Sequence, residues 1–271
     1  MNKSVTICIN ACERKPGLNL LLNTLMFQTM VDFDLVVVDD SAKADLSNVV
    51  SSARGRFEKM GVELSYVKNG QRLGLAKSRN VGMDRMDTPV GIFLDDDHVC
   101  DSRFVEYLME VFEKRHNVGC VGALFPHLKN RKMLAKQIPR IFGDIKYDAE
   151  WSNRQRYCYK FDPDDDGIRP ALVLGGIVAF KIDDSIRKNE NLSFVSHRED
   201  TLFSLRYLQA GYNNFVATRS LAYHRVDPTG GCRTFGDDAD KQRAADDAIY
   251  NRLMGSELRS AMLVARARCK G

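Results

Sequence analysis

Apolar positions in the first 115 residues alternate between short continuous runs and repeats at helical spacing. The runs are expected to form strands, at residues 5–9, 34–40, 64–68 and 90–94. The helical repeats follow them, at residues 18–26, 49–60, 75–86 and 104–115. Strands that alternate with helices form a mostly parallel sheet covered on both faces, and ligands bind beyond the carboxyl ends of its strands. The pattern therefore predicts an α/β fold with a site in the loops after residues 9, 38 and 94.

The second half of the chain is less regular. Residues 125–170 lose periodicity and are rich in basic and aromatic side chains, whereas residues 171–180 regain strand character around Gly175 and Gly176. A helix is expected to open at residues 197–200, which include Glu199 and Asp200, and to stop at Gly211. Residues 214–223 are expected to be extended and residues 237–265 helical.

Composition is that of an ordinary globular enzyme, with 44% hydrophobic and 28% charged residues. The net charge of +4 is unevenly placed, because residues 251–271 carry five basic side chains and one acidic one. This end could bind an acidic partner or an anionic membrane surface, and a solvated helix face is the simpler explanation. Seven cysteines without a Cys-x-x-Cys pair, and no visible leader or membrane-spanning run, predict a cytoplasmic protein that is at most peripheral at a membrane.

Three carboxylates, Asp95, Asp96 and Asp97, directly follow the buried strand of residues 90–94. Such a cluster repels itself and is costly to desolvate, so a divalent cation would stabilise it. If the segment is extended, Asp95 and Asp97 point the same way, and oxygen ligands suit Mg²⁺ or Mn²⁺. A solvated acidic turn is the alternative, but the apolar strand in front favours a metal or phosphate site.

Two other acidic stretches are weaker candidates. Residues 164–166 are also aspartates, but a proline and a glycine flank them and no strand precedes them, which is typical of a solvated turn. Residues 95–106 resemble a calcium loop, but Cys100 stands where such a loop requires glycine.

Several segments, in this order, resemble glycosyltransferase family 2 of the GT-A fold. The matching segments are residues 18–29, 33–41, 69–82, 92–97 with its Asp-x-Asp motif, 175–176, 199–211 and a late His224. The resemblance covers the chain from residue 5 to about residue 231. It implies a GT-A domain over residues 1–235, with a Rossmann-like sheet, a nucleotide-sugar-binding half (1–100) and an acceptor-binding half (101–235). Residues 236–271 would form a C-terminal helical extension.

By this resemblance the first loop and the end of the second strand hold the donor nucleotide. The residues implied are Asn10, Ala11, Glu13, Asp39, Asp40 and Arg79. Asp97 would ligate the metal, Asp95 and Asp96 would contact the ribose or the ion, and His224 would be a further ligand unless it is structural. The first loop departs from the family's usual Pro-Thr and Tyr-Asn-Arg pattern. His98 stands where another Asp is common, and it would either shift the metal preference toward Mn²⁺ or, as we favour, pack beneath the loop.

The implied reaction is transfer of a sugar from a nucleoside-diphosphate sugar, with a UDP-sugar favoured, to a saccharide or another hydroxyl acceptor. Mn²⁺ or Mg²⁺ would stabilise the leaving diphosphate. Asp200, with Glu199 beside it, would take the acceptor proton, and direct displacement would invert the anomeric carbon; acidic residues also occur at helix N-termini simply to complement the dipole. Gly175 and Gly176 would allow the sugar or acceptor close to the backbone. The two acidic clusters must then share one cleft.

The acceptor is expected to contact residues 125–170. Side chains there that could bind a sugar or form a lid are Trp151, Arg154, Arg156, Tyr157 and Tyr159. Three alternatives stay open: a glycosyltransferase acting on a modified base in nucleic acid, suggested by the basic C-terminal end, a nucleotidyltransferase, and a non-catalytic protein that keeps the fold. A nucleotidyltransferase normally has a glycine-rich basic loop, which residues 10–16 lack, and the intact carboxylates argue against a non-catalytic role.

Overall fold

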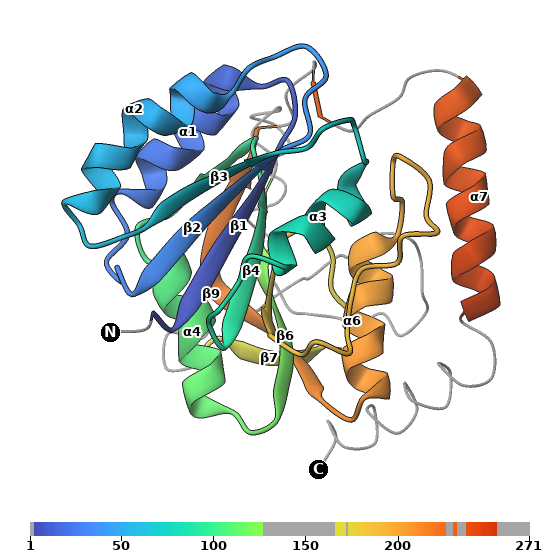
Figure 1. Cartoon of the computed structure of the whole chain (residues 1–271). Coiled ribbons are helices and arrows are strands. Elements are labelled where there is room, and N and C mark those ends of the chain that lie inside the picture. Colours follow the sequence, from blue (N-terminus) through green and yellow to red (C-terminus); the bar gives the residue numbers. More distant parts are fainter. Residues whose placement is uncertain (1–2, 127–165, 172, 226–229, 232–236, 254–271) are drawn as a thin grey trace.

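The computed structural model describes residues 3–126, 166–171, 173–225, 230–231 and 237–253, and a single twisted sheet lies at its centre (Figure 1). The sheet order is β3-β2-β1-β4-β8-β6-β9-β5, and β7 pairs with β9. The first strands in space are β3 (Leu64–Lys68), β2 (Phe33–Asp39), β1 (Val5–Ala11) and β4 (Val90–Asp95). The others are β5 (His98–Cys100), β6 (Val118–Leu124), β7 (Ile168–Ala171), β8 (Val178–Lys181) and β9 (Asn213–His224).

The mostly parallel sheet that the sequence predicts is present in the first four strands, β1 to β4. β1 pairs in parallel with both β2 and β4, and β2 pairs in parallel with β3. Beyond β4 the sheet is mixed, because β8 runs antiparallel to both of its neighbours, β4 and β6. The carboxyl ends of β1, β2 and β4 therefore meet at one edge of the sheet, as expected.

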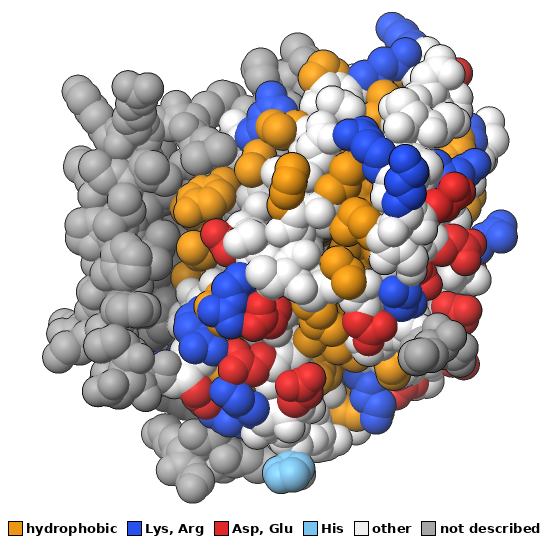
Figure 2. Space-filling model, turned by 90° about the vertical axis from the view of Figure 1, so that its left-hand side faces the viewer, with side chains coloured by type: hydrophobic (Ala, Val, Ile, Leu, Met, Phe, Trp, Pro, Cys, Tyr) orange, Lys and Arg blue, Asp and Glu red, His pale blue; other side chains and the backbone are white. Residues whose placement is uncertain are grey.

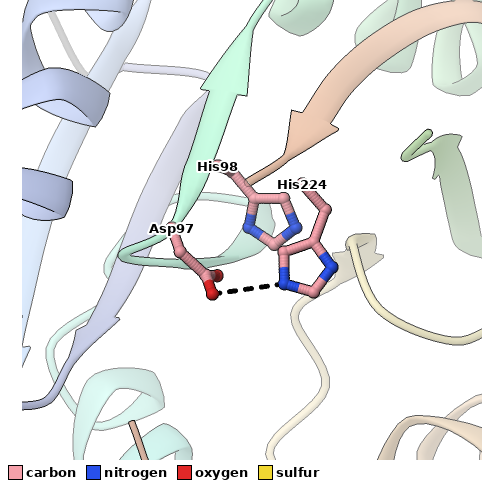
Figure 3. Close-up of side chains that lie close together, drawn as sticks. All are labelled: Asp97, His98 and His224. Carbon is pink, nitrogen blue, oxygen red and sulfur yellow. Dashed lines mark hydrogen bonds and ion pairs between the residues drawn. The ribbon is translucent and has the colours of Figure 1, made fainter. Parts of the chain in front are cut away.

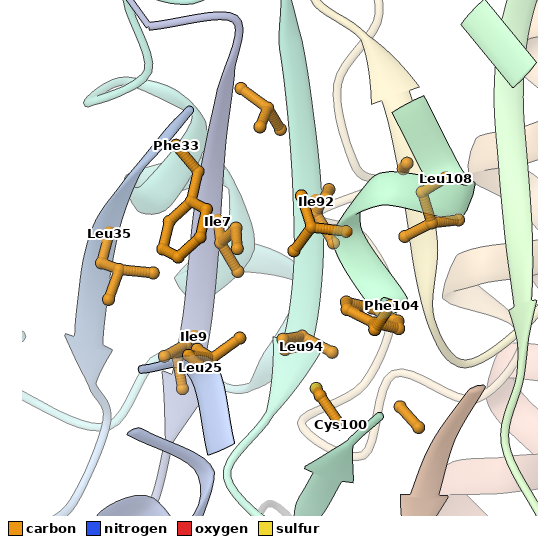
Figure 4. Close-up of a cluster of buried hydrophobic side chains, with 14 of the residues drawn as sticks. Ile7, Ile9, Leu25, Phe33, Leu35, Ile92, Leu94, Cys100, Phe104 and Leu108 are labelled. Carbon is orange, nitrogen blue, oxygen red and sulfur yellow. The ribbon is translucent and has the colours of Figure 1, made fainter. Parts of the chain in front are cut away.

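Helices cover both faces of the sheet, as the alternation of strands and helices predicts. They are α1 (Lys15–Leu25), α2 (Ser47–Glu58), α3 (Leu75–Met83), α4 (Phe104–Lys114), α6 (Glu199–Gln209) and α7 (Asp237–Leu253). Successive strand residues point to opposite faces, so Ile7 packs with Leu25 and Phe104 in one core (Figure 4), which is built on α1, α2 and α4. Cys8 and Phe93 pack in the other, with residues of α3 and α6.

The second half of the sheet differs from the sequence-based prediction in two places. Residues 171–180 form two strands rather than one, since β7 ends at Ala171 and β8 begins at Val178, with Gly176 between them at a φ of 74°. β6 was not predicted. All seven of its residues are buried, but Gly119 and Gly122 interrupt its apolar run, and glycine weakens the sequence signal of a strand.

The C-terminal helix predicted over residues 237–265 is present as α7, and it packs beside α6 (Figure 1) through Tyr250 and leucines of α6. The remainder of that predicted helix, the five aromatic and basic side chains proposed for acceptor binding, and residues 164–165 lie outside the described residues. In the described part of the chain, no helix has the length and apolar character needed to cross a bilayer.

Gly82, in the last turn of α3, is expected to tolerate no side chain. α3 approaches β1 so closely that a Cβ at this position would collide with the Cys8 thiol and also touch Val38. Gly82→Ala should therefore lower the free energy of unfolding by about 1–3 kcal/mol, because helix and strand must separate. Urea unfolding followed by circular dichroism measures this change in the free energy of unfolding.

In the matched control, Gly55→Ala in α2, nothing lies within 4 Å of the new Cβ, and alanine favours the helix by about 1 kcal/mol. If Gly82→Ala and Gly55→Ala lower the free energy of unfolding equally, the close contact of α3 with β1 is not the cause of the loss.

Candidate active site

A cleft with a volume of about 230 Å³ opens at the edge where β1, β2 and β4 end. Seven of the residues singled out in the sequence line it, namely Asn10, Ala11, Asp40, Asp95, Asp96, Asp97 and His224. Cys12, Arg14, Leu75, Ser78, Val195 and Gly231 complete the lining and were not predicted. The loops expected to share one edge of the sheet therefore do form one cavity.

The polar residues after β1 and β2 divide into those that line the cleft and those that shape its loops. Asp40 accepts hydrogen bonds from Asn69 Nδ2 at 2.8 Å and from the backbone N–H of Gly74 at 3.0 Å, which fixes the loop before α3. Asn10 is buried, and its Nδ2 has no hydrogen-bond partner among the residues that the structure describes. Because an unpaired buried donor is costly, this amide suits an acceptor atom on a ligand in the cleft.

Asp39 and Glu13, both predicted to contact the nucleotide, make internal contacts instead and do not line the cleft. Asp39 is fully buried and accepts from Tyr66 Oη at 2.7 Å and from Lys68 Nζ at 3.0 Å. Glu13 has a φ of 64° and accepts backbone N–H groups of residues 42–44. These two side chains hold the loops after β1 and β2 in place.

The acidic motif is a turn, not the extended segment that the sequence argument assumed. β4 ends at Asp95, residues 96–97 turn, and β5 begins at His98. The carboxylates consequently have different partners: Asp95 pairs with Arg79, Asp96 with Arg14, and Asp97 with both Arg14 and His224. The extended geometry expected for Asp95 to Asp97 is therefore wrong, although both carboxylates line the cleft.

Arg14 is the main counter-charge to this turn. Its Nη1 lies 2.7 Å from Asp96 Oδ1 and 3.1 Å from Asp97 Oδ2, and its Nη2 donates to the Gly230 carbonyl at 3.2 Å. Burial raises the pKa of Asp96 to about 7 in spite of Arg14 and a backbone N–H from Cys12. Burial also opposes ionisation of Asp97, but the hydrogen bond and charge of His224, together with Arg14, outweigh it and lower the pKa of Asp97. Asp97 is therefore ionised at neutral pH.

Asp97, His98 and His224 form the group in the described residues that could hold a metal ion (Figure 3), with ligand atoms within 4.8 Å of one another. His224 Nε2 lies 3.2 Å from Asp97 Oδ2. The pairing of β5 with β9 sets His98 directly opposite His224, and their rings are 5.0 Å apart. His98 is buried beneath the loop, as favoured from the sequence, yet desolvation also lowers its pKa and keeps the imidazole neutral. One carboxylate and two imidazoles are ligands that fit a divalent transition metal.

Glu199 and Asp200 begin α6 and meet two buried cations. Arg79 and Lys188 each contact both carboxyl groups, and Asp200 Oδ2 accepts the backbone N–H of Gly176 at 2.8 Å. Burial raises the pKa of Glu199. Burial acts on Asp200 in the same direction, but the charges of Arg79 and Lys188 outweigh it and lower the pKa of Asp200. Of the two carboxyl groups, Asp200 therefore loses its proton more readily than Glu199.

Arg79 connects the two acidic clusters. Its buried guanidinium binds Glu199 and Asp200 through Nη1, and its Nη2 lies 3.0 Å from Asp95 Oδ1. Carboxylates that are more than 100 residues apart in the chain therefore lie around one side chain. The two clusters meet around Arg79, but Glu199 and Asp200 are not among the residues that line the cleft. The shared cleft that the sequence argument required therefore stays a prediction.

Lys188, Asn80 and Arg14 are the polar residues of this centre that sequence reasoning missed. Asn80 follows Arg79 in α3 and clamps the Lys188 backbone, donating to its carbonyl at 3.1 Å and accepting from its N–H at 2.9 Å. Lys188 lies in an irregular segment with no periodicity to mark it. Arg14 was a candidate only as part of a loop that departs from the expected pattern.

Comparison with known proteins places this geometry among sugar-transferring enzymes. The model of glycosyl transferase family 2 matches residues 6–163. An uncharacterized glycosyltransferase of Haemophilus influenzae is 28% identical over 123 residues, which are 43% of this chain and 37% of the relative. A teichoic acid poly(glycerol phosphate) polymerase of Staphylococcus epidermidis is 24% identical over 112 residues, 41% of this chain and 15% of that protein. The chain thus spans less than half the length of these two relatives.

Solved structures share the fold. Residues 1–349 of S. aureus TarS in complex with UDP-GlcNAc superpose with a TM-score of 0.63 at 14% identity, covering 93% of this chain and 67% of that one. The mannosyltransferase PcManGT of Pyrobaculum calidifontis, in complex with GDP-Man and Mn²⁺, gives a TM-score of 0.59 at 14% identity, covering 100% of this chain and 76% of the other.

Proposed function

The chain belongs to glycosyltransferase family 2 and has the GT-A fold. On that premise we propose that it transfers a sugar from a nucleoside-diphosphate sugar to a hydroxyl acceptor, with inversion at the anomeric carbon. The observation that carries this proposal is Arg79, which joins the acidic turn beside the cleft to the Glu199–Asp200 pair. A leaving-group site and a base within one centre are what such a displacement requires.

The cleft is the proposed donor site. Asn10 and Ala11 at the end of β1 and Asp40 directly after β2 would hold the nucleoside. The Nδ2 of Asn10, which has no partner in the described part of the chain, would supply a donor. Asp39 and Glu13 would act only by holding the loops. A UDP-sugar is the first donor to test, because the TarS complexes contain UDP and UDP-GlcNAc, and GDP-mannose is the second, because PcManGT was solved with GDP-Man.

The metal would be held by Asp97, His98 and His224. Once bound, a divalent ion stabilises the charge that develops on the leaving diphosphate. Imidazole ligands suit transition metals better than Mg²⁺, so we propose Mn²⁺ as the preferred ion; Mn²⁺ is also present in the PcManGT complex. Asp95 is assigned to the donor ribose rather than to the metal, because its carboxylate faces Arg79 and is not part of the three-residue group. Asp96, bound by Arg14 and Cys12, would support the turn.

Asp200 is the proposed general base. Its side chain is 19% exposed and its pKa is lowered, whereas the Glu199 side chain is 3% exposed and its pKa is raised. An ionised, accessible carboxylate can take the proton of an attacking hydroxyl, and a protonated, enclosed one cannot. Gly175 and Gly176 lie directly before β8, and the Gly176 N–H orients Asp200. Attack by the acceptor on the face opposite the leaving diphosphate then gives inversion.

The proposed organisation places the donor half in residues 1–100 and the acceptor half in residues 101–235, with α7 in the extension that follows. A saccharide is the acceptor class we favour. The nucleic-acid alternative rests on the basic C-terminal end, of which Arg252 is the described member. On the side of the molecule in Figure 2, Lys and Arg side chains are interspersed with Asp and Glu, which does not favour a phosphate-binding face there.

A donor screen tests the proposed function. The protein is incubated with UDP-sugars and GDP-mannose in the presence of Mn²⁺ or Mg²⁺, with and without saccharide acceptors, and release of the nucleoside diphosphate is measured. Turnover of at least one donor is expected, faster with Mn²⁺ than with Mg²⁺. No release from any donor with either ion would favour the non-catalytic alternative, and release that is unaffected by chelation would contradict the metal site.

A further inference from the structure

We propose that Lys188 is a positioning residue of the transfer reaction, whose buried ammonium group holds the Asp200 carboxylate in the orientation needed to receive the acceptor proton. This inference rests on the proposed role of Asp200 as the base. It adds a residue that no motif in the sequence indicates, in the segment between β8 and α6.

The contacts of Lys188 are directed at the base. Its side chain has no exposed surface, and its Nζ lies 3.1 Å from Asp200 Oδ1 and 2.5 Å from Glu199 Oε2. Arg79 contacts the same Asp200 Oδ1 from α3, and the Gly176 N–H donates to Oδ2. Both Asp200 oxygens are thus held, and the two cations that hold Oδ1 come from different segments of the chain.

An ammonium group is costly to bury, so its presence needs compensation. The two carboxyl groups provide part of it, and the Phe93 and Phe203 rings, 4.9 and 4.2 Å from Nζ, provide the rest through cation–π contacts. Asn80 fixes the Lys188 backbone from both sides. A side chain held this firmly defines where Asp200 can lie.

The charges around Asp200 support the same conclusion. The titratable groups that face it are Arg79, Lys188 and Glu199, and Asp95 lies on the far side of Arg79. Burial raises the pKa of Asp200, and the two cations together bring it below its ordinary value. With Lys188 removed, Arg79 is the cation that remains, among the described residues, in contact with Glu199, Asp200 and Asp95. Asp200 then loses one of the contacts that orient it.

The test uses Lys188→Ala in the full chain and a donor that gives turnover in the screen. We expect kcat to fall by about tenfold or more, while the donor KM changes by less than about threefold, because Lys188 does not line the cleft. Methylammonium chloride should restore part of kcat by occupying the vacated space, and tetramethylammonium chloride at equal ionic strength should not. The matched control is Lys181→Ala on β8, an exposed lysine beside Tyr212, whose kcat should stay unchanged.

Two further variants cover the case in which Lys188→Ala does not fold. Lys188→Met keeps the length of the side chain without its charge and should lose turnover, whereas Lys188→Arg should retain more of it. A wild-type kcat in Lys188→Met would overturn the assignment. Equal losses of kcat in Lys188→Met and Lys188→Arg, together with no rescue of Lys188→Ala by methylammonium, would also overturn it. Asp200→Asn, measured alongside, separates the role of Lys188 from the proposed function. If sugar transfer survives in Asp200→Asn, Asp200 is not the general base, whatever the result for Lys188.

Discussion

Asp200→Asn should lower kcat for sugar transfer by about 10²–10⁴-fold, which is the usual contribution of a general base. The amide keeps the shape of the side chain and can still accept the Gly176 N–H, but it cannot take a proton from the acceptor. Donor affinity should change little, because Asp200 does not line the donor cleft. Steady-state kinetics with the active donor, together with calorimetric donor binding, measure both quantities.

Glu199→Gln is the matched comparison for that variant. Burial raises the pKa of Glu199, so this residue keeps its proton more readily than Asp200, and glutamine resembles its protonated form. The loss in kcat should therefore be smaller than in Asp200→Asn. A severe loss in Glu199→Gln combined with a mild one in Asp200→Asn would reverse the roles of the two carboxylates.

Asp97→Ala should weaken Mn²⁺ binding by on the order of 100-fold or more, since a ligand contributes at least as much as the outer partners of metal sites do. Asp97 is ionised at neutral pH and is the partner of His224. The loss of free-ion signal in a Mn²⁺ titration followed by electron paramagnetic resonance reports binding without any need for turnover. Donor binding in the presence of Mn²⁺ should weaken with it.

Two other variants make this metal test specific. Asp166→Ala removes the last residue of the other acidic run, which pairs with Arg115 on the surface, and should leave Mn²⁺ binding unchanged. His98→Gln should reduce the preference for Mn²⁺ over Mg²⁺, because it removes an imidazole from the group. If the Mn²⁺ affinity of Asp97→Ala is unchanged, the ion binds elsewhere. If His98→Gln keeps the same preference for Mn²⁺ over Mg²⁺, His98 only packs beneath the loop and does not bind the ion.

Local pattern was sufficient to predict the first half of the fold. The apolar run that forms β4 and the helical repeats of α1 and α4 appear where the sequence places them, with ends shifted by a few residues. The position of the acidic motif at the end of β4 followed from the same pattern. The double layer of core also follows, because alternate residues of a strand face opposite sides and both sides are apolar here.

Contacts between distant segments could not be predicted in this way. The pairing of His98 with His224 depends on the register of β5 against β9, and the meeting of Lys188 with Asp200 depends on how an irregular segment folds back on α3. The turn at residues 96–97 separates Asp95 from Asp97, although their spacing in an extended chain would align them.

The sequence by itself determined which segments become strands and helices and which strand end carries the carboxylates, because side-chain periodicity acts within a few residues of the chain. Only the tertiary structure decided which of those carboxylates is ionised and which residues accompany it. Burial and the charges of Arg14, Arg79 and Lys188 set those states. Strand register and helix packing bring these charges to the carboxylates, in the case of Arg79 and Asp200 across 121 residues of the chain.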